Sequence, residues 1–362
     1  MNLGRRPGLN GVITDDLTAA QAGDEQAFAR LIAPHRAPLQ AHCYRMLGSL
    51  ADAEDALQET LVRAWRALPR FEGRSSLRGW LYRIATNVSL RALERRPRRL
   101  LPLDRGPARD GSEGPGDAVT EPVWLEPFPD AELSDGLAAP EARYAERESV
   151  ELAFVAALQH LPARQRAVLL LRDVLGFAPH EIAEMAGTAP TAIHSTLQRA
   201  RRTARERLPD RSQQQTLRAL GDRRLRELAD RYVRAWERDD VEAIVALLSD
   251  DAAFAMPPLP GWYRGREAIA AFLAARPLAL PRRWLRERVG ASGQLAFVTY
   301  GLASRTLPDG SLALAQDGAL HGHGVELLTV GGDGRIARAT AFLDPSLVTR
   351  FGLPATVPPP VG

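Results

Sequence analysis

The chain has 362 residues, 45% of them hydrophobic, and a formal net charge of +3 at pH 7. This length predicts two or three domains, and the apolar content is enough for each of them to have a core. The single cysteine excludes a disulfide framework and a cysteine-rich zinc site. Neither a membrane span of roughly 20 apolar residues nor a signal-peptide-like run occurs, which predicts a cytoplasmic protein without a membrane partner.

Residues 1–14 are predicted to form a loose tail, and residues 15–96 an all-α bundle. Apolar residues recur at steps of three and four up to about residue 50, which indicates helix. Pro34 and Pro38 interrupt this stretch. Because proline lacks the backbone N–H that a helix interior uses, we expect these prolines to divide the stretch into two helices.

Two further helices are predicted over residues 52–68 and 77–93, each with apolar side chains on one face. The first has acidic residues early and basic residues late, which suits the helix dipole. The second carries mainly arginine on its outer face. Between them lies a short loop with Gly73, in which Ser75 or Ser76 can cap the helix that follows.

Residues 97–140 are dense in Pro, Gly and Asp. This composition predicts a linker that is too polar and too interrupted to form a core of its own. The patch Trp124, Leu125, Pro127 and Phe128 is unusual in such a segment, and we expect it to pack on a neighbouring domain.

A second all-α domain is predicted over residues 141–208. A helix that stops at Gly187 precedes a longer basic helix, and this spacing is typical of a helix-turn-helix. Ile193 and Leu197 are expected to face inward, and Thr188 to cap the second helix. Arginine far outnumbers acid in residues 188–208, a charge pattern expected where a helix follows the phosphate backbone.

These stretches resemble bacterial sigma factors of the extracytoplasmic-function group. The motif F-x-G-x-S-S-L-x-x-W-L, which begins at Phe71 between an acidic-rich and a basic helix, resembles their region 2. The motifs L-P-x-x-Q-R-x-V-x-x-L-R from Leu161, E-I-A from Glu181 and A-I-x-S-x-L-x-R-A-R from Ala192 resemble their region 4. The W-L-E-P-F-P-D stretch from Trp124 resembles the linker of a subset with an extra C-terminal domain. For this linker the resemblance implies a second interpretation, passage through the polymerase cleft.

The resemblance implies a sigma factor that directs core RNA polymerase to promoters and melts the minus-ten element. No phosphate-binding G-x-x-x-x-G-K-[ST] loop occurs, so melting would not use ATP. The implied partners are the beta-prime and beta subunits of the polymerase and promoter DNA, without a cofactor, a metal or a catalytic residue. The residues implied for core-polymerase binding are Asp52, Asp55, Gln58, Glu59 and Arg63. Those implied for the minus-ten DNA are Phe71, Ser75, Ser76, Trp80, Arg83, Asn87 and Arg91. Those implied for the minus-thirty-five DNA are Thr191, His194, Ser195, Gln198, Arg199, Arg201 and Arg202. Trp80 is equally compatible with core packing and base contact.

After a joint at residues 209–221, residues 222–350 have a different pattern, and residues 351–362 form a Pro-rich tail. Helices are predicted at 225–240, 241–251 and 265–275, and stretches with period-two alternation follow between residues 284 and 342. Helices followed by a meander favour an α+β domain. The pattern resembles the SnoaL-like, nuclear-transport-factor-2-like cone fold, which has a pocket between its helices and a curved sheet.

The possible pocket residues of this third domain are Trp236, Trp262, Tyr263, Asp317, His321 and His323. The two histidines flank Gly322, so on a strand they would face the same side, but no third metal ligand can be named. We expect this domain to regulate the sigma domains in cis, either by clamping them or by binding a small-molecule ligand. Two alternatives stay open: an enzyme fused to the sigma module, and a helix-turn-helix regulator that does not join polymerase.

Overall fold

The computed structural model describes residues 9–119, 121, 123–133, 145–280, 284–302, 304–306, 312–314 and 318–358. Within these residues, no helix is both long enough and apolar enough to cross a membrane. The chain divides into two compact units. The N-terminal unit comprises Met1–Arg98, Glu132–Arg143 and Ala157–Arg207, and the C-terminal unit comprises Arg99–Ala131, Tyr144–Ala156 and Leu208–Gly362.

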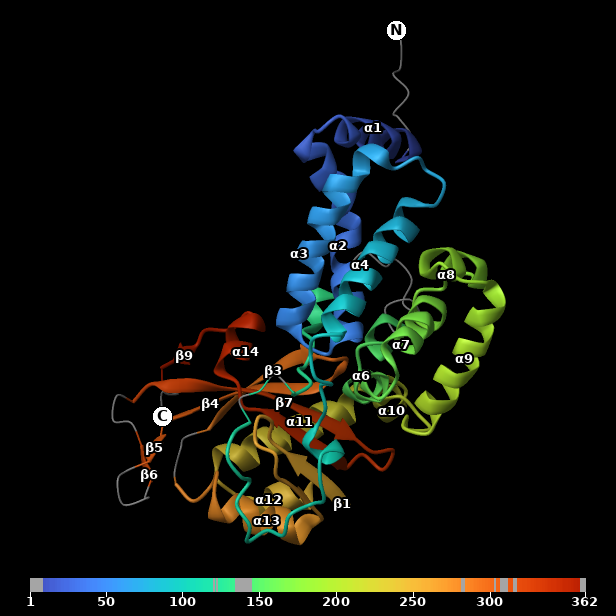
Figure 1. The fold of residues 1–362 in the computed structure, drawn as a ribbon. Coiled ribbons are helices and arrows are strands. Elements are labelled where there is room, and N and C mark those ends of the chain that lie inside the picture. The colour runs from blue at the N-terminus through green and yellow to red at the C-terminus, as the bar shows by residue number, and fades with distance from the viewer. Residues whose placement is uncertain are drawn as a thin grey trace. The chain divides into compact units, whose positions relative to one another are not determined.

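The first part of the N-terminal unit is a helical bundle (Figure 1). Its elements are α1 (Leu9–Gln21), α2 (Glu25–Leu47), α3 (Leu50–Ala67), the short 3-10 turn η1 (Leu68–Arg70) and α4 (Leu77–Leu93). Helices α2, α3 and α4 pack against one another around buried side chains such as Tyr44 and Leu81. Helix α4 has the predicted bounds, whereas α1 begins at Leu9, inside the predicted tail.

The predicted division of the chain at the two prolines is wrong. Pro34 and Pro38 both lie inside α2, which continues through them. Each proline removes one backbone donor, but side chains beside them such as Leu31 are buried, and packing of this apolar face outweighs the lost hydrogen bonds. The chain breaks instead at Gly23, where φ is 99°. The Asp24 side chain then caps α2 by accepting two backbone N–H groups of its first turn.

The second part of this unit is the predicted helix-turn-helix domain. Its elements are α7 (Ala163–Leu169), the π-helical turn η4 (Leu170–Val174), α8 (Pro179–Ala186) and α9 (Pro190–Arg205), and the unit boundary falls within α6 (Leu152–Gln159). Helix α8 ends at Gly187 with φ 63°, and α9 packs on it through Ile193 and Leu197. The predicted cap is wrong: Ala189, not Thr188, is the N-cap of α9, and no side chain caps it. Pro190 at the first helical position has no N–H that needs a partner.

The C-terminal unit is α+β, as predicted. Its helices are α10 (Gln213–Leu220), α11 (Asp222–Glu237), α12 (Val241–Ala246), α13 (Arg266–Ala275) and α14 (Pro345–Arg350), with the 3-10 turns η2 (Pro102–Asp104) and η3 (Asp130–Glu132) in and beside the linker. Its strands are β1 (Leu248–Ala255), β2 (Trp262–Arg264), β3 (Leu285–Ala291), β4 (Gln294–Leu302), β5 (Ser304–Thr306), β6 (Leu312–Leu314), β7 (Leu320–Val330), β8 (Ile336–Phe342) and β9 (Thr356–Val357). Helix α10 occupies most of the stretch predicted as a joint.

The main sheet has the strand order β2-β1-β8-β7-β4-β3, and β9 pairs with β7. Strand β1 pairs parallel with β8, and the other neighbours are antiparallel. The pairing of β7 with β4 shifts register between Thr299 and Tyr300, opposite Gly324, whose φ is 145°. Helices α11 to α13 share one apolar core with this sheet, which includes the buried Tyr232 and Phe297.

Most of the predicted linker, residues 99–131, belongs to the C-terminal unit. Trp124 is 7% exposed, and Leu125 and Phe128 are fully buried. The interpretation that this patch packs on a neighbouring domain is therefore confirmed for this structure. The linker does contribute to a core, one that it shares with the third domain, which its polar composition alone did not predict.

Candidate functional site

Helix α3 presents most of the side chains predicted to bind core polymerase. Asp55, Gln58 and Glu59 are exposed along one side of it. Arg63 is partly exposed, and its Nε donates to the Glu59 carboxylate at 2.6 Å. This i,i+4 pair lies at the surface, where it adds little to stability. The side of α3 thus offers acidic and amide groups for a partner, and their role stays a prediction.

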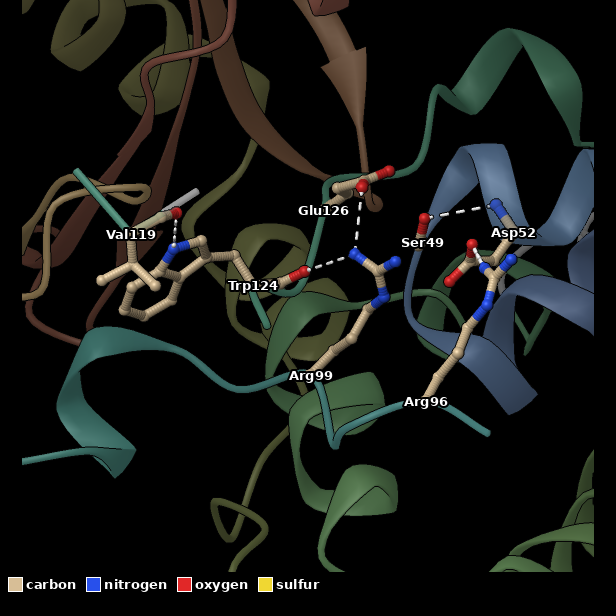
Figure 2. A network of polar contacts seen from close by, with 7 residues as sticks. All are labelled: Ser49, Asp52, Arg96, Arg99, Val119, Trp124 and Glu126. Atoms are coloured by element: carbon tan, nitrogen blue, oxygen red, sulfur yellow. Dashed lines mark hydrogen bonds and ion pairs between the residues drawn. The ribbon is translucent and has the colours of Figure 1, made fainter. Parts of the chain in front are cut away.

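Asp52 differs from the other four. It is only 7% exposed, its backbone N–H donates to Ser49 Oγ, and its carboxylate forms an ion pair with Arg96 (Figure 2). Ser49 is the N-cap of α3, so Asp52 lies in the first turn, where a negative charge is stabilised. These contacts give Asp52 a role in joining α3 to the chain after α4.

Helix α4 carries a row of exposed polar side chains. Arg83, Asn87 and Arg91 follow one another at steps of four residues and are all exposed. Such spacing places them on one face of the helix. The face combines two guanidinium groups, which can bind phosphates, with an amide that can read a base edge.

The loop before α4 brings two aromatic rings together. Phe71 and Trp80 lie with ring centroids 5.0 Å apart, and Trp80 is 7% exposed. Ser76 is the N-cap of α4 and accepts from Gly79 N–H, while Ser75 is exposed. Trp80 therefore takes the core-packing position in this conformation, with its ring at the edge of an exposed loop.

Arg78 joins the start of α4 to the helix-turn-helix domain, a contact that the sequence did not reveal. Its guanidinium lies 4.2 Å from the centroid of the Phe177 ring and donates to the Leu175 carbonyl at 2.7 Å. Gly79, next to it, approaches Met185 of α8 so closely that an added Cβ would lie 3.4 Å from the methionine methyl. The start of α4 thus packs on the helix-turn-helix within the N-terminal unit.

Helix α9 presents the residues predicted to read the minus-thirty-five DNA. All seven are exposed along it, namely Thr191, His194, Ser195, Gln198, Arg199, Arg201 and Arg202. Arg201 is tied to Asp173 by two hydrogen bonds of 2.5 and 2.9 Å. The others point away from the apolar face of α9, which gives the helix a basic outer face suited to a DNA groove.

The C-terminal unit contains a cavity of about 260 Å³. Of the predicted pocket residues, Trp236 and His323 line it. His321 is not among the lining residues, and Asp317 lies outside the described residues. Among the described residues, no group of three or more His, Cys, Asp or Glu could hold a metal ion.

The cavity also contains a charged pair, Arg286 and Glu326, that was not predicted from the sequence. Arg286 of β3 and Glu326 of β7 are 7% and 1% exposed, line the cavity and form an ion pair. The Tyr232 hydroxyl donates to the other Glu326 oxygen at 3.0 Å. Burial raises the pKa of Tyr232 well above its ordinary value, so it stays a donor. A glutamate inside the apolar run of residues 325–330 was the available signal, because such charges are rarely buried unless paired.

Trp262 and Tyr263 hold the linker. Trp262 Nε1 donates to the Gly106 carbonyl and the Tyr263 hydroxyl to the Glu113 carbonyl, each at 2.8 Å. Neither residue lines the cavity. The two side chains therefore dock the first half of the linker on the third domain.

The second half of the linker is also fixed (Figure 2). Arg99 Nη1 donates to the Trp124 carbonyl at 3.2 Å and lies 3.3 Å from Glu126 Oε1, and Trp124 Nε1 donates to the Val119 carbonyl. Burial lowers the pKa of Arg99, and the Glu126 charge opposes that shift. Further along, Ser292 N–H donates to the Phe128 carbonyl at 2.7 Å.

Comparisons with known proteins decide the family. Family models match residues 31–99 as Sigma-70 region 2, residues 151–203 as Sigma-70, region 4, and residues 229–339 as a SnoaL-like domain. Over 358 residues the chain is 42% identical to the ECF RNA polymerase sigma factor SigG of Mycobacterium tuberculosis. The matched residues cover 96% of this chain and 90% of SigG. The chain belongs to the extracytoplasmic-function (ECF) sigma factors. This sigma factor is also 34% identical over 203 residues to the sigma factor CnrH of Cupriavidus metallidurans, covering 53% of this chain and 93% of CnrH.

A solved structure supports the fold. The crystal structure of the extracytoplasmic-function sigma factor SigJ of Mycobacterium tuberculosis matches 88% of this sigma factor and 97% of its own chain, with a TM-score of 0.53 and 21% identity. This likeness shows the fold alone. Two sigma regions and a C-terminal SnoaL-like domain, in the predicted order, are therefore the architecture of this ECF sigma factor.

Proposed function

We propose that this ECF sigma factor directs core RNA polymerase to specific promoters and melts their minus-ten element without ATP, and that its SnoaL-like domain regulates this activity in cis. The observation that carries the first part is the exposed row Arg83, Asn87 and Arg91 on α4, together with the partly exposed Phe71 in the loop before that helix. Melting a base step costs a few kcal/mol, and capture of an unstacked base by an aromatic and polar site offsets that cost.

The two DNA elements would be read by different helices. Exposed α9 offers guanidinium groups for phosphates and Gln198 for a base edge. The acidic and amide side of α3, with Asp55 and Glu59, would bind the polymerase beta-prime subunit. Membership of the ECF sigma factors disfavours the alternative of a regulator that never joins polymerase.

Run-off transcription with core polymerase tests the first part. Asn87→Ala and Arg83→Ala should each lower the product by about fivefold or more, because such contacts contribute about 1–3 kcal/mol. Arg30→Ala is the matched control, since Arg30 is an exposed arginine of α2 outside the row. Core binding in a pull-down should stay unchanged for the α4 variants and fall for Asp55→Arg. Failure of the unaltered chain to initiate on a genome-wide set of promoter fragments would overturn the proposal.

Cis regulation is supported by the packing of the linker on the SnoaL-like domain. Residues 99–131 join region 2 to region 4, yet they pack with the SnoaL-like domain through Trp262, Tyr263 and Ser292. A linker held in this way restricts the conformations open to the sigma regions. Release of the linker would therefore accompany activation, and transcription should rise when its anchors are weakened.

Regulation is favoured over catalysis by the same domain. Glu326 is the buried carboxylate of the cavity, and its two oxygens accept from Arg286 and Tyr232. A carboxylate engaged in this way is suited to holding Arg286 rather than to removing a proton from a substrate.

A further inference from the structure

The cavity of the SnoaL-like domain is large enough for a small ligand. Its volume of about 260 Å³ exceeds the roughly 150 Å³ that suffices for benzene in an engineered apolar cavity. Aromatic and aliphatic side chains such as Trp236, Phe254, Phe272 and Phe342 form most of its wall. An apolar molecule of about two fused rings fits this volume and this lining.

The polar end of the cavity offers hydrogen-bond donors. Arg286 lies with its guanidinium 4.0 Å from the centroid of the Trp236 ring, and its side chain is 3% exposed. One of its nitrogens, Nη1, pairs with Glu326, while its Nε has no hydrogen-bond partner among the described residues and is enclosed by the protein, which leaves the Nη groups to meet a ligand. Both Glu326 oxygens already accept hydrogen bonds. The hydrogen-bonding groups that remain available at the pair are therefore guanidinium N–H donors, so the ligand must supply an acceptor.

Charge decides between kinds of acceptor. Arg286 and Glu326 together are neutral, and both are buried. A ligand carboxylate would add a second negative charge beside the buried Glu326 in a mostly apolar site, which is costly. A carbonyl oxygen meets the donor without that cost.

The linker forms part of the cavity wall. Pro115 lines the cavity, and its carbonyl accepts from Gly261 N–H at 2.8 Å. The backbones approach so closely that a Cβ on Gly261 would lie 2.6 Å from this carbonyl oxygen. On the N-terminal side of Pro115, the Tyr263 hydroxyl donates to the Glu113 carbonyl. On its C-terminal side, Val119 N–H donates to the Pro258 carbonyl. A ligand inside the cavity thus contacts a wall that includes the segment between the sigma regions.

We propose that this cavity binds a small uncharged molecule of about two rings with a carbonyl-type acceptor, and that binding stabilises the linker on the SnoaL-like domain. Because the ligand favours the docked linker, linkage requires that linker release lower ligand affinity by the same factor. The binding is independent of the function proposed above; its effect on transcription rests on that function.

Calorimetric titration of the full chain with three probes of one shape tests the ligand class. 2-Acetylnaphthalene carries a carbonyl, 2-isopropenylnaphthalene replaces its oxygen by a carbon, and 2-naphthoate carries a charge. The ketone should bind at least about tenfold more tightly than either of the others, as expected for a hydrogen bond to a charged donor. Equal binding of ketone and hydrocarbon would refute the acceptor requirement, tighter binding of naphthoate would refute the uncharged class, and no binding of any probe would refute the site.

Two variants locate the binding. Ala341→Phe fills the cavity from β8, at the residue paired with Glu326 in the register of β7 and β8, so the ketone should no longer bind while the chain stays folded. Arg286→Met with Glu326→Gln removes both charges together, so the ketone should lose its advantage over the hydrocarbon. Ketone binding that survives Ala341→Phe would place it elsewhere and overturn the assignment.

Hydrogen exchange tests the linker wall without polymerase. The amides of Gly261 and Val119 donate across the contact between linker and domain. Saturating ketone should slow their exchange by about tenfold, and unchanged exchange despite binding would refute the coupling. Run-off transcription with and without ketone is a separate measurement. If exchange slows while transcription is unaffected, the cis-regulation proposal fails and the ligand site stands.

Discussion

Replacing the two linker anchors, Trp262→Phe together with Tyr263→Phe, should release the linker. Each substitution keeps an aromatic ring in its packed position and removes one hydrogen bond of 2.8 Å to a linker carbonyl. One such bond contributes about 1 kcal/mol net. The pair should therefore shift the ratio of docked to released linker by about 2 kcal/mol, or roughly thirtyfold, less any coupling between the two neighbouring sites.

Trypsin cleavage reports this ratio. Arg105 and Arg109 lie in the docked half of the linker, so cleavage after them requires local release. When opening and closing are fast relative to cleavage, the rate follows the released fraction and should rise by up to about thirtyfold. Run-off transcription should rise in the same variant.

Tyr300→Phe is the matched control. Tyr300 is a fully buried tyrosine of the same domain whose hydroxyl donates to the Pro354 carbonyl at 2.9 Å, away from the linker. Its loss should cost similar stability without speeding cleavage in the linker. Equal cleavage rates in the double variant and in the control would refute the view that these side chains hold the linker.

Three further outcomes follow from individual side chains. Burial raises the pKa of Glu151 to about 7 against an ordinary value of 4.5, so the native state retains a proton that the unfolded chain releases. The Glu151 contribution to the free energy of unfolding should fall by up to about 3 kcal/mol as pH rises from 4.5 to 7. It is read as the difference between urea titrations of the protein and of Glu151→Gln at each pH, because buried His42, whose pKa is lowered to about 3, changes stability in the opposite direction in both chains; a difference that does not vary with pH would contradict this. Arg202→Ala should weaken DNA binding at all sequences and reduce the slope of log affinity against log salt by about 1 in anisotropy titrations. Arg201→Ala should do less, because that guanidinium is paired with an aspartate, and equal slopes would be evidence against this difference. Arg166 is 2% exposed and donates to three backbone carbonyls, so Arg166→Met should destabilise the N-terminal unit by about 3 kcal/mol, whereas exposed Arg164→Met should leave its denaturation midpoint unchanged.

The sequence was most informative where local rules and packing agree. The bounds of α4 follow from the cap at Ser76 and the apolar period after it. Pro34 and Pro38 show the limit of local rules, since burial of the helix face around them maintains α2. Strand β1 was not predicted, because its pairing with β8 joins residues far apart in the chain.

The candidate sites divide in the same way. Family motifs located the residues of α3, α4 and α9, which the structure leaves largely exposed. The Arg286–Glu326 pair comes from strands forty residues apart, so only the register of the sheet could reveal it. Trp262 and Tyr263 were noticed as aromatic side chains, but their bonding to linker carbonyls depends on tertiary structure.

The alternation of the two units along the chain has a consequence for synthesis. Strand β8 lies between β1 and β7 in the sheet, yet it is among the last segments that the ribosome makes. Domains fold largely as they emerge, N-terminal segments first. Both sigma regions are therefore outside the ribosome before the surface that receives the linker is complete. A nascent chain of this sigma factor would therefore pass through a stage with both sigma regions complete and the linker undocked, and a chaperone would encounter it in that form first.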